Sequence, residues 1–248
     1  MPRYTTMVVF GDSLSDNGNA GHYSNGPPWV EVLAKRLGLP LRPSRSGGNN
    51  YAVGGALTHG SATDLRGQVV RYLASHDGRA DPQALYVLYA GANDLLRAGC
   101  MTGRDTAART AAAALGASVA DLANAGARTI LVPNLPDIGY APVVRAHGAA
   151  CTAEASRLTR VLNAALEDQL RKVENQTHVH IHRLDAYGLM ERLMADPEAA
   201  GFHDVTTPCL RDHCDGQLFW DYLHPTAAAH ATLAAAALAV LQADGERE

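Results

Sequence analysis

The sequence predicts a three-layer α/β/α fold with a parallel central sheet, because short apolar runs alternate with longer helical patterns along the whole chain. The runs are rich in Val, Ile, Leu and Tyr, which is typical of strands that are buried on both faces. Parallel strands joined by helices need right-handed crossovers, which place helices on both sides of the sheet. We see no internal repeat and no linker, so we expect a single domain over residues 1–248.

The apolar runs predict a five-stranded sheet, in which the second run along the chain is the weakest. In chain order the expected strands are Tyr4–Phe10, Asn50–Val53, Leu85–Ala90, Thr129–Pro133 and Val179–Leu184. The expected helices are Pro28–Leu37, Thr63–Ser75, Arg104–Ala125, Thr152–Val173, Ala186–Met194 and Pro225–Gln242.

Composition and charge exclude several classes of function. The net charge is −4, from 21 basic and 25 acidic residues, and neither sign gathers into a long run. We therefore expect no nucleic-acid partner.

The longest apolar stretch, Ala227–Leu241, is mostly alanine and contains His230, so we expect no transmembrane segment. The first residues do not resemble a signal peptide, which favours a cytoplasmic protein unless a leader was removed. The sequence does not indicate the oligomeric state.

Cysteine and histidine patterns leave two questions open. The four cysteines fit no zinc pattern, but Cys209 and Cys214 flank the short loop Leu210–His213 and are expected to form either a disulfide or two free thiols. The histidines at 178, 180 and 182 alternate along an expected strand. They indicate either a metal site or, as the simpler interpretation, an edge strand with Val179 and Ile181 facing the core. We expect no bound metal.

Polar turns follow four of the expected strands. These turns are Gly11-Asp12-Ser13, Gly54-Gly55, Gly91-Ala92-Asn93-Asp94 and Asn134-Leu135-Pro136-Asp137. Because ligands bind beyond the carboxyl ends of parallel strands, we expect these turns to lie together at one edge of the sheet.

Ser13 and the segment Phe219–Thr226 contain the residue types of a nucleophilic site. Attack on an ester needs a nucleophile, a base, and a group that orients the base. Asp221 and His224 on one tight turn can present a carboxylate to one imidazole nitrogen and leave the other nitrogen for a serine. Taken alone, Ser13 also fits a turn or a helix cap, and Asp221 and His224 fit capping or packing roles.

Four ordered blocks resemble the GDSL lipase/esterase family, which is also called SGNH, and the resemblance covers Val8 to about His230. The blocks are Phe10-Gly11-Asp12-Ser13-Leu14-Ser15-Asp16-Asn17-Gly18-Asn19, Asn50-Tyr51-Ala52-Val53-Gly54-Gly55-Ala56, Gly91-Ala92-Asn93-Asp94-Leu95-Leu96 and Asp221-Tyr222-Leu223-His224-Pro225-Thr226. Lesser matches, such as Tyr23–Glu31, are similar to the branch with plant GDSL lipases and bacterial phospholipases and haemolysins.

The resemblance implies a flavodoxin-like SGNH hydrolase fold and a serine esterase or lipase that acts on carboxylic esters without a cofactor. It implies that Ser13 is the nucleophile, His224 the general base and Asp221 its orienting acid. The backbone N–H groups of Ser13 and Gly55 and the side-chain amide of Asn93 are then the oxyanion hole. Gly54 competes with Gly55 for this role.

Two other functions use the same residues. An acyltransferase would pass the same acyl group from Ser13 to an acceptor alcohol, and a catalytically silent scaffold would only bind a lipid or a carbohydrate. The sequence does not indicate the acyl chain length or the alcohol of the substrate.

Overall fold

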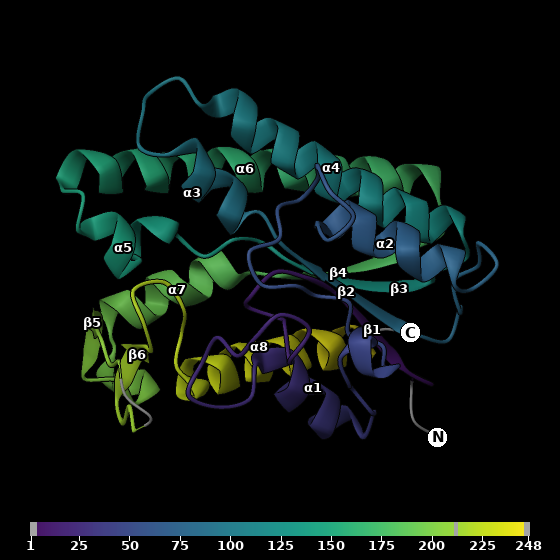
Figure 1. The fold of residues 1–248 in the computed structure, drawn as a ribbon, viewed down its shortest axis with the longest axis horizontal. Coiled ribbons are helices and arrows are strands. Elements are labelled where there is room, and N and C mark those ends of the chain that lie inside the picture. Colours follow the sequence, from purple (N-terminus) through teal and green to yellow (C-terminus); the bar gives the residue numbers. More distant parts are fainter. Residues whose placement is uncertain (1–3, 211–212, 246–248) are drawn as a thin grey trace.

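The computed structural model describes residues 4–210 and 213–245 of the chain (Figure 1). Arg211 and Asp212, which belong to the loop between Cys209 and Cys214, lie outside the described residues, as do residues 1–3 and 246–248 of the expected domain.

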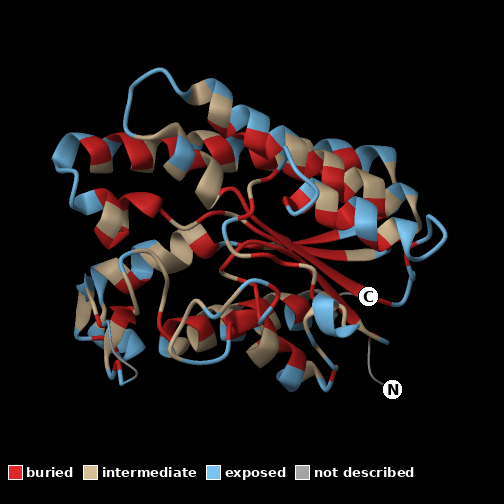
Figure 2. Cartoon of the chain, viewed as in Figure 1, coloured by how far each residue is buried: buried red, intermediate tan, exposed pale blue. Residues whose placement is uncertain are grey.

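The central sheet is parallel throughout, with the strand order β1-β2-β3-β4. Its strands are β1 (Met7–Gly11), β2 (Leu85–Tyr89), β3 (Thr129–Pro133) and β4 (His180–Leu184). Every residue of β1 and β2 is buried, which explains the apolar character of both runs. Figure 2 shows the sheet as the most deeply buried layer, with helices on either side. The predicted α/β architecture with a parallel sheet is confirmed.

The prediction of a regular fifth strand at Asn50–Val53 is wrong. This segment lies beside β1 and forms only isolated bridges, from Asn50 to Val9 of β1 and from Asn50 to Pro43. The Asn50 side chain accepts a hydrogen bond from the Ala52 N–H (3.0 Å) and donates one to the Ser15 carbonyl (2.7 Å). Such local side-chain bonds compete with a regular ladder, so the sheet has four regular strands.

Helices cover both faces of the sheet, with α2, α4 and α6 on one side and α1 and α8 on the other (Figure 1). The helices are α1 (Trp29–Leu37), α2 (Leu65–Ala74), α3 (Ala92–Ala98), α4 (Asp105–Asn124), α5 (Pro142–Arg145), α6 (Ala149–Gln176), α7 (Ala186–Ala195) and α8 (Ala227–Gly245). Short 3₁₀ turns are η1 (Ser44–Ser46), η2 (Ile138–Tyr140) and η3 (Glu198–Ala200). All six predicted helices are present with shifted ends.

Several further features of the fold were not predicted from the sequence. Helix α3 begins directly after Gly91, whose φ of 124° favours glycine, where the sequence predicts only a turn. A small second sheet pairs β5 (Asp204–Pro208) with β6 (Gln217–Phe219). A second hydrophobic cluster lies next to this sheet and is formed by Leu193, Phe202, Leu218, Phe219 and Ala229.

All four cysteines are paired. Cys209 and Cys214 form a disulfide, which is one of the two alternatives that the sequence leaves open. Cys100 and Cys151 form a second disulfide that joins the loop after α3 to the start of α6. Sequence spacing gives no sign of this pair, because its cysteines are 51 positions apart.

Candidate active site

The end of strand β1 is held on two sides before the chain turns to Ser13. A side chain at Gly11 would collide with the backbone oxygen of Tyr89 on β2, so only glycine fits here. On the other side, the fully buried Gln68 accepts from the Gly11 N–H and donates to the Gly11 carbonyl, both at 2.8 Å. This pair of bonds fixes the backbone two residues before Ser13.

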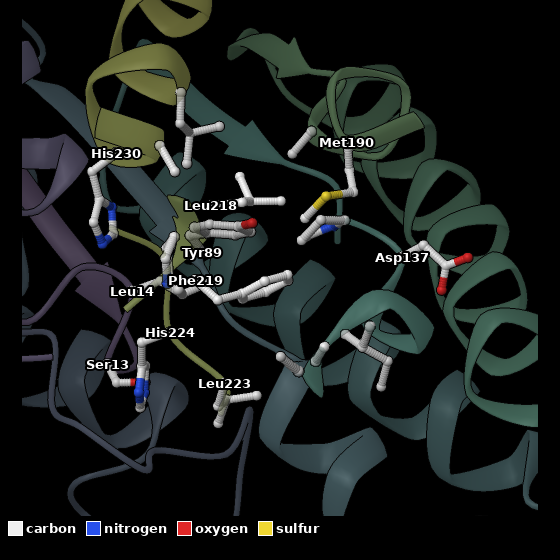
Figure 3. Close-up of a pocket in the computed structure, with 18 of the residues that line it drawn as sticks. Ser13, Leu14, Tyr89, Asp137, Met190, Leu218, Phe219, Leu223, His224 and His230 are labelled. Carbon is white, nitrogen blue, oxygen red and sulfur yellow. The ribbon is translucent and has the colours of Figure 1, made fainter. Parts of the chain in front are cut away.

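Ser13, His224 and Asp221 form a continuous hydrogen-bonded chain. The distance from Ser13 Oγ to His224 Nε2 is 2.9 Å, and His224 Nδ1 lies 2.7 Å from Asp221 Oδ2. Figure 3 shows Ser13 and His224 side by side at one end of a pocket. The structure thus brings Ser13 together with an Asp–His pair that lies more than two hundred positions later in the sequence.

The turn from Asp221 to His224 is closed by Asp221 itself. Asp221 Oδ1 accepts hydrogen bonds from the backbone N–H groups of Leu223 (2.7 Å) and His224 (2.6 Å). Burial alone raises the pKa of the Asp221 carboxyl, but the bonds from the His224 side chain and these two N–H groups outweigh burial, so the net pKa lies below the usual value. The carboxylate is therefore held in its charged form beside the imidazole.

The segment Tyr23–Gly26 braces this turn from the opposite end of the chain. The Tyr23 ring lies 5.1 Å from the His224 ring, centroid to centroid. Ser24 Oγ donates to the Pro225 carbonyl at 2.9 Å, and Asn25 Oδ1 accepts from the Ala227 N–H at 2.8 Å. Sequence reasoning noted this segment only as a family match and assigned it no role.

Gly55 is better placed than Gly54 to donate a free backbone N–H. The Gly54 N–H is already bonded to Asp16 Oδ2 at 2.8 Å, and a side chain at Gly54 would collide with Tyr23. Among residues 4–210 and 213–245, no acceptor is bonded to the backbone N–H of Gly55 or of Ser13. Gly55 has a φ of 77°, so its turn favours glycine as well.

Asn93 and Asp94, in the first turn of α3, are joined to the loop that follows Gly55. Asn93 Nδ2 donates one hydrogen to the Ala56 carbonyl at 3.0 Å, which leaves its second hydrogen available. Asp94 accepts hydrogen bonds from the Thr58 N–H (3.0 Å) and from Thr58 Oγ1 (2.8 Å). The expected oxyanion donors Gly55 and Asn93 are thus held by one hydrogen-bonded unit, and both residues line the same cleft.

A largely apolar pocket opens beside Ser13, and Asn93 and His224 also line it. Its inner wall comes from α7, β6 and α8 and consists of Leu189, Met190, Leu193, Leu218, Phe219 and Leu233. In Figure 3, Leu218 and Met190 lie at the end of the pocket away from Ser13. This lining suits the hydrocarbon part of a ligand.

Two buried titratable residues, Asp12 and His230, also line this pocket. Burial raises the pKa of the Asp12 carboxyl from 3.8 to about 7, although the Leu14 N–H and His224 oppose this change. Burial lowers the pKa of His230 from 6.5 to about 3, and nearby His224 adds to this change. His230 Nδ1 accepts from the backbone N–H of Trp29 at 3.2 Å, so its neutral ring carries the proton on Nε2.

The histidines of β4 lie away from these residues. The His180 and His182 rings are 4.4 Å apart, and Val179 and Ile181 are buried, as the edge-strand interpretation predicts, but His182 is buried as well. Within the part of the chain that the structure describes, no group of three or more His, Cys, Asp or Glu side chains could hold a metal ion.

Comparison with known proteins shows the family. Residues 7–237 match the family described as GDSL-like Lipase/Acylhydrolase, and the chain belongs to this family, as its sequence blocks predict. The chain is 37% identical to "Lipase 1" of Photorhabdus luminescens, over 64% of this chain and 27% of that protein. It is 24% identical to the phosphatidylcholine-sterol acyltransferase of Aeromonas hydrophila, over 99% of this chain and 92% of that protein.

A solved structure shares the fold. A member of the lipolytic protein G-D-S-L family from Veillonella parvula DSM 2008 superposes with a TM-score of 0.57 at 16% identity, covering 96% of this chain and 98% of that one. No helix that could span a bilayer is found among residues 4–210 and 213–245.

Proposed function

We propose that this protein hydrolyses carboxylic esters through an acyl-enzyme formed on Ser13. The observation that carries the proposal is the continuous chain from Ser13 Oγ through His224 to Asp221, with links of 2.9 and 2.7 Å. A serine, an imidazole and a carboxylate at these distances are the parts that nucleophilic acyl transfer requires.

The reaction proceeds in two halves. His224 Nε2 accepts the Ser13 proton while Oγ attacks the ester carbonyl carbon, and Asp221 stabilises the resulting imidazolium through Nδ1–H. His224 then gives the proton to the leaving alcohol oxygen as the carbon–oxygen bond breaks. Water enters, loses a proton to His224 and releases the acid from Ser13 by the same route.

The oxyanion of each tetrahedral intermediate needs donors. We assign this role to the N–H groups of Ser13 and Gly55 and to the second amide hydrogen of Asn93, because all three lack an acceptor among the described residues. Donors aimed at the oxyanion stabilise the charge as it develops in the transition state. No metal or organic cofactor enters any of these steps.

A fluorophosphonate probe tests the proposal. Wild-type protein should be labelled at Ser13, as located by peptide mass spectrometry, and should hydrolyse a nitrophenyl butyrate. Ser13→Ala should lose both the label and the hydrolysis while keeping its melting temperature. A folded wild-type protein that neither reacts with the probe nor cleaves the ester would be a silent binding scaffold, and the proposal would be wrong.

Acyl transfer to an alcohol is a second candidate function, which the name of the Aeromonas hydrophila relative favours. The same acyl-enzyme would be attacked by an acceptor alcohol in place of water. Hydrolysis of nitrophenyl butyrate in the presence of added 1-hexanol separates the two reactions. Hexyl butyrate in the products, detected by gas chromatography, identifies transfer, and butyrate alone identifies hydrolysis.

A further inference from the structure

A second apolar groove lies on the other side of the Asp221–His224 turn. Its wall includes Leu95 and Leu96 of α3, Val143 and Val144 of α5, and Tyr222. The side chains of Leu96 and Val143 are only partly buried, and Tyr222 is 55% exposed. Apolar side chains gathered in an exposed concave surface are typical of a binding site.

The groove is adjacent to the pocket beside Ser13, because three segments contribute residues to both. On α3, Asn93 faces the pocket and Leu96 faces the groove, one turn further along the helix. Ile138 and Leu223 line both spaces and form the ridge between them. Figure 3 shows Leu223 at the edge of the pocket, on the side of His224.

The chemistry of the proposed reaction assigns one side of the ester to each space. The acyl carbon becomes bonded to Ser13, so the acyl chain must begin in the pocket that Ser13 lines. The alcohol takes its proton from His224 and must then leave, so it needs the space beyond the Asp221–His224 turn. Leu223, between these two residues, borders that space.

We infer that the groove bordered by Leu96, Val143 and Leu223 binds the alcohol part of the substrate, and that this part is an apolar chain or ring. The inference rests on the proposed function and names its substrate class, which is esters with apolar groups on both sides of the ester bond. Among the described residues, neither lysine nor arginine lines the groove, its carboxylate, Asp221, is already bonded to His224, and the other polar side chains in its lining are those of His147 and Tyr222. A sugar or a phosphate would find few partners there.

Four esters measure the two sides separately. They are ethyl acetate, hexyl acetate, ethyl hexanoate and hexyl hexanoate. Each ester is used at a concentration below its solubility limit, and its hydrolysis is measured as acid release at constant pH. We expect kcat/KM for hexyl acetate to exceed that for ethyl acetate by about tenfold or more, because each buried methylene adds several-fold to binding. Hexyl hexanoate should be the best of the four substrates.

Two variants of matched chemistry assign the preferences to the two spaces. Leu96→Asn in the groove should lower the ratio of kcat/KM for hexyl acetate to kcat/KM for ethyl acetate by about fivefold or more. The same variant should change the ratio of kcat/KM for ethyl hexanoate to kcat/KM for ethyl acetate by less than about twofold. Met190→Gln in the pocket should lower the hexanoate-to-acetate ratio of the ethyl esters and leave the hexyl-to-ethyl ratio of the acetates nearly unchanged. Val70→Gln is the surface control, because Val70 is exposed on α2 and lines neither space, and it should change neither ratio.

Three results would overturn the inference. A wild-type protein that cleaves ethyl esters but shows no gain from the longer alcohol has no apolar alcohol site. Equal changes of both ratios in Leu96→Asn would mean that the groove does not serve one side of the ester. Failure to cleave any ester, together with no fluorophosphonate label on Ser13, would instead remove the proposed function and the inference with it.

Discussion

In the proposed mechanism, the hydrogen bond between Ser13 and His224 makes the two residues one functional unit. Either residue without the other leaves no activated nucleophile, so Ser13→Ala and His224→Ala should each reduce kcat by at least about 10⁴-fold. The double variant should be little slower than either single variant, for the same reason. Steady-state kinetics on all three proteins, with circular dichroism as the folding control, measure this. Losses that add in the double variant would mean that the residues act separately.

At Asn93, the free amide hydrogen should act only on charge that develops during the reaction. Asn93→Ala should therefore lower kcat by roughly 10²–10³-fold, with little change in KM. Asn93→Asp should be at least as damaging, because a carboxylate would face both the oxyanion and the Ala56 carbonyl.

Measuring kcat, KM and melting temperature on the same preparations separates this role from a structural one. If Asn93 only holds the Ala56 carbonyl, the Asn93→Ala protein should have a lower melting temperature and keep its kcat per folded molecule.

At the scale of elements, α3 and the loop after Gly55 are held together by Asp94 and Thr58. Burial raises the pKa of Asp94 above the usual value, although the bonds from Thr58 oppose this change. Thr58→Val removes the hydroxyl donor and leaves Oδ1 of the half-buried Asp94 carboxylate without this hydrogen bond. We expect kcat to fall by about tenfold with KM nearly constant, since the proposed oxyanion donors Gly55 and Asn93 would lose their relative position.

Thr58→Ser is the matched control, because it keeps both hydrogen bonds and should retain near-normal kcat. The melting temperatures of the two variants show how much of any loss is structural. A Thr58→Val protein with unchanged kcat would show that the contact contributes only to folding.

Elements with a strong period were predictable from the sequence, and those that depend on distant contacts were not. The strands β1 and β2 and the helix α6 were predictable because the apolar pattern of each is contained in its own sequence. Helix α3 has seven residues and directly follows Gly91, so its sequence resembles a turn. The strands β5 and β6 are short and partly exposed, and they pair only because the chain returns on itself.

The same contrast applies to the site. The residues proposed as catalytic could be named from four sequence blocks, because Ser13, Gly55, Asn93 and His224 each lie within two positions of a glycine or proline. Gln68 and Thr58 could not be named, because a glutamine in a helix or a threonine in a loop has no distinctive pattern. Their roles come from the contacts with Gly11 and Asp94, which only the folded chain brings together.

At the scale of the whole molecule, the first and last parts of the chain stabilise each other around the site. Ser24 and Trp29 are bonded to Pro225 and His230, each pair 201 positions apart. Trp29 also donates from Nε1 to Ser15 Oγ, two residues after Ser13. Loosening the start of α8 should therefore disturb both His224 and the nucleophile turn.

Asp12 and His230 should give the folded protein opposing dependences on pH. Between pH 3.8 and about 7, folded Asp12 holds a proton that the unfolded chain has lost, so its contribution to stability falls as pH rises. Between about pH 3 and 6.5, folded His230 is neutral while the unfolded chain is protonated, so its contribution rises with pH. Each slope is about 1.4 kcal/mol per pH unit, and the two nearly cancel between pH 4 and 6.5.

Single variants should reveal the two opposing slopes. Asp12→Asn still accepts from the Leu14 N–H, and its melting temperature relative to wild type should increase with pH between 4 and 6.5. His230→Asn still offers an oxygen to the Trp29 N–H, and its relative melting temperature should decrease over the same range. Each change should be roughly 3–5 °C per pH unit for a chain of this size.

Differential scanning calorimetry at half-unit steps of pH measures both differences in melting temperature. The contributions of other titrating groups cancel because these groups are common to all three proteins. Relative melting temperatures that stay flat with pH would show that burial does not shift the two groups, whereas slopes of the opposite sign would reverse their assigned protonation states.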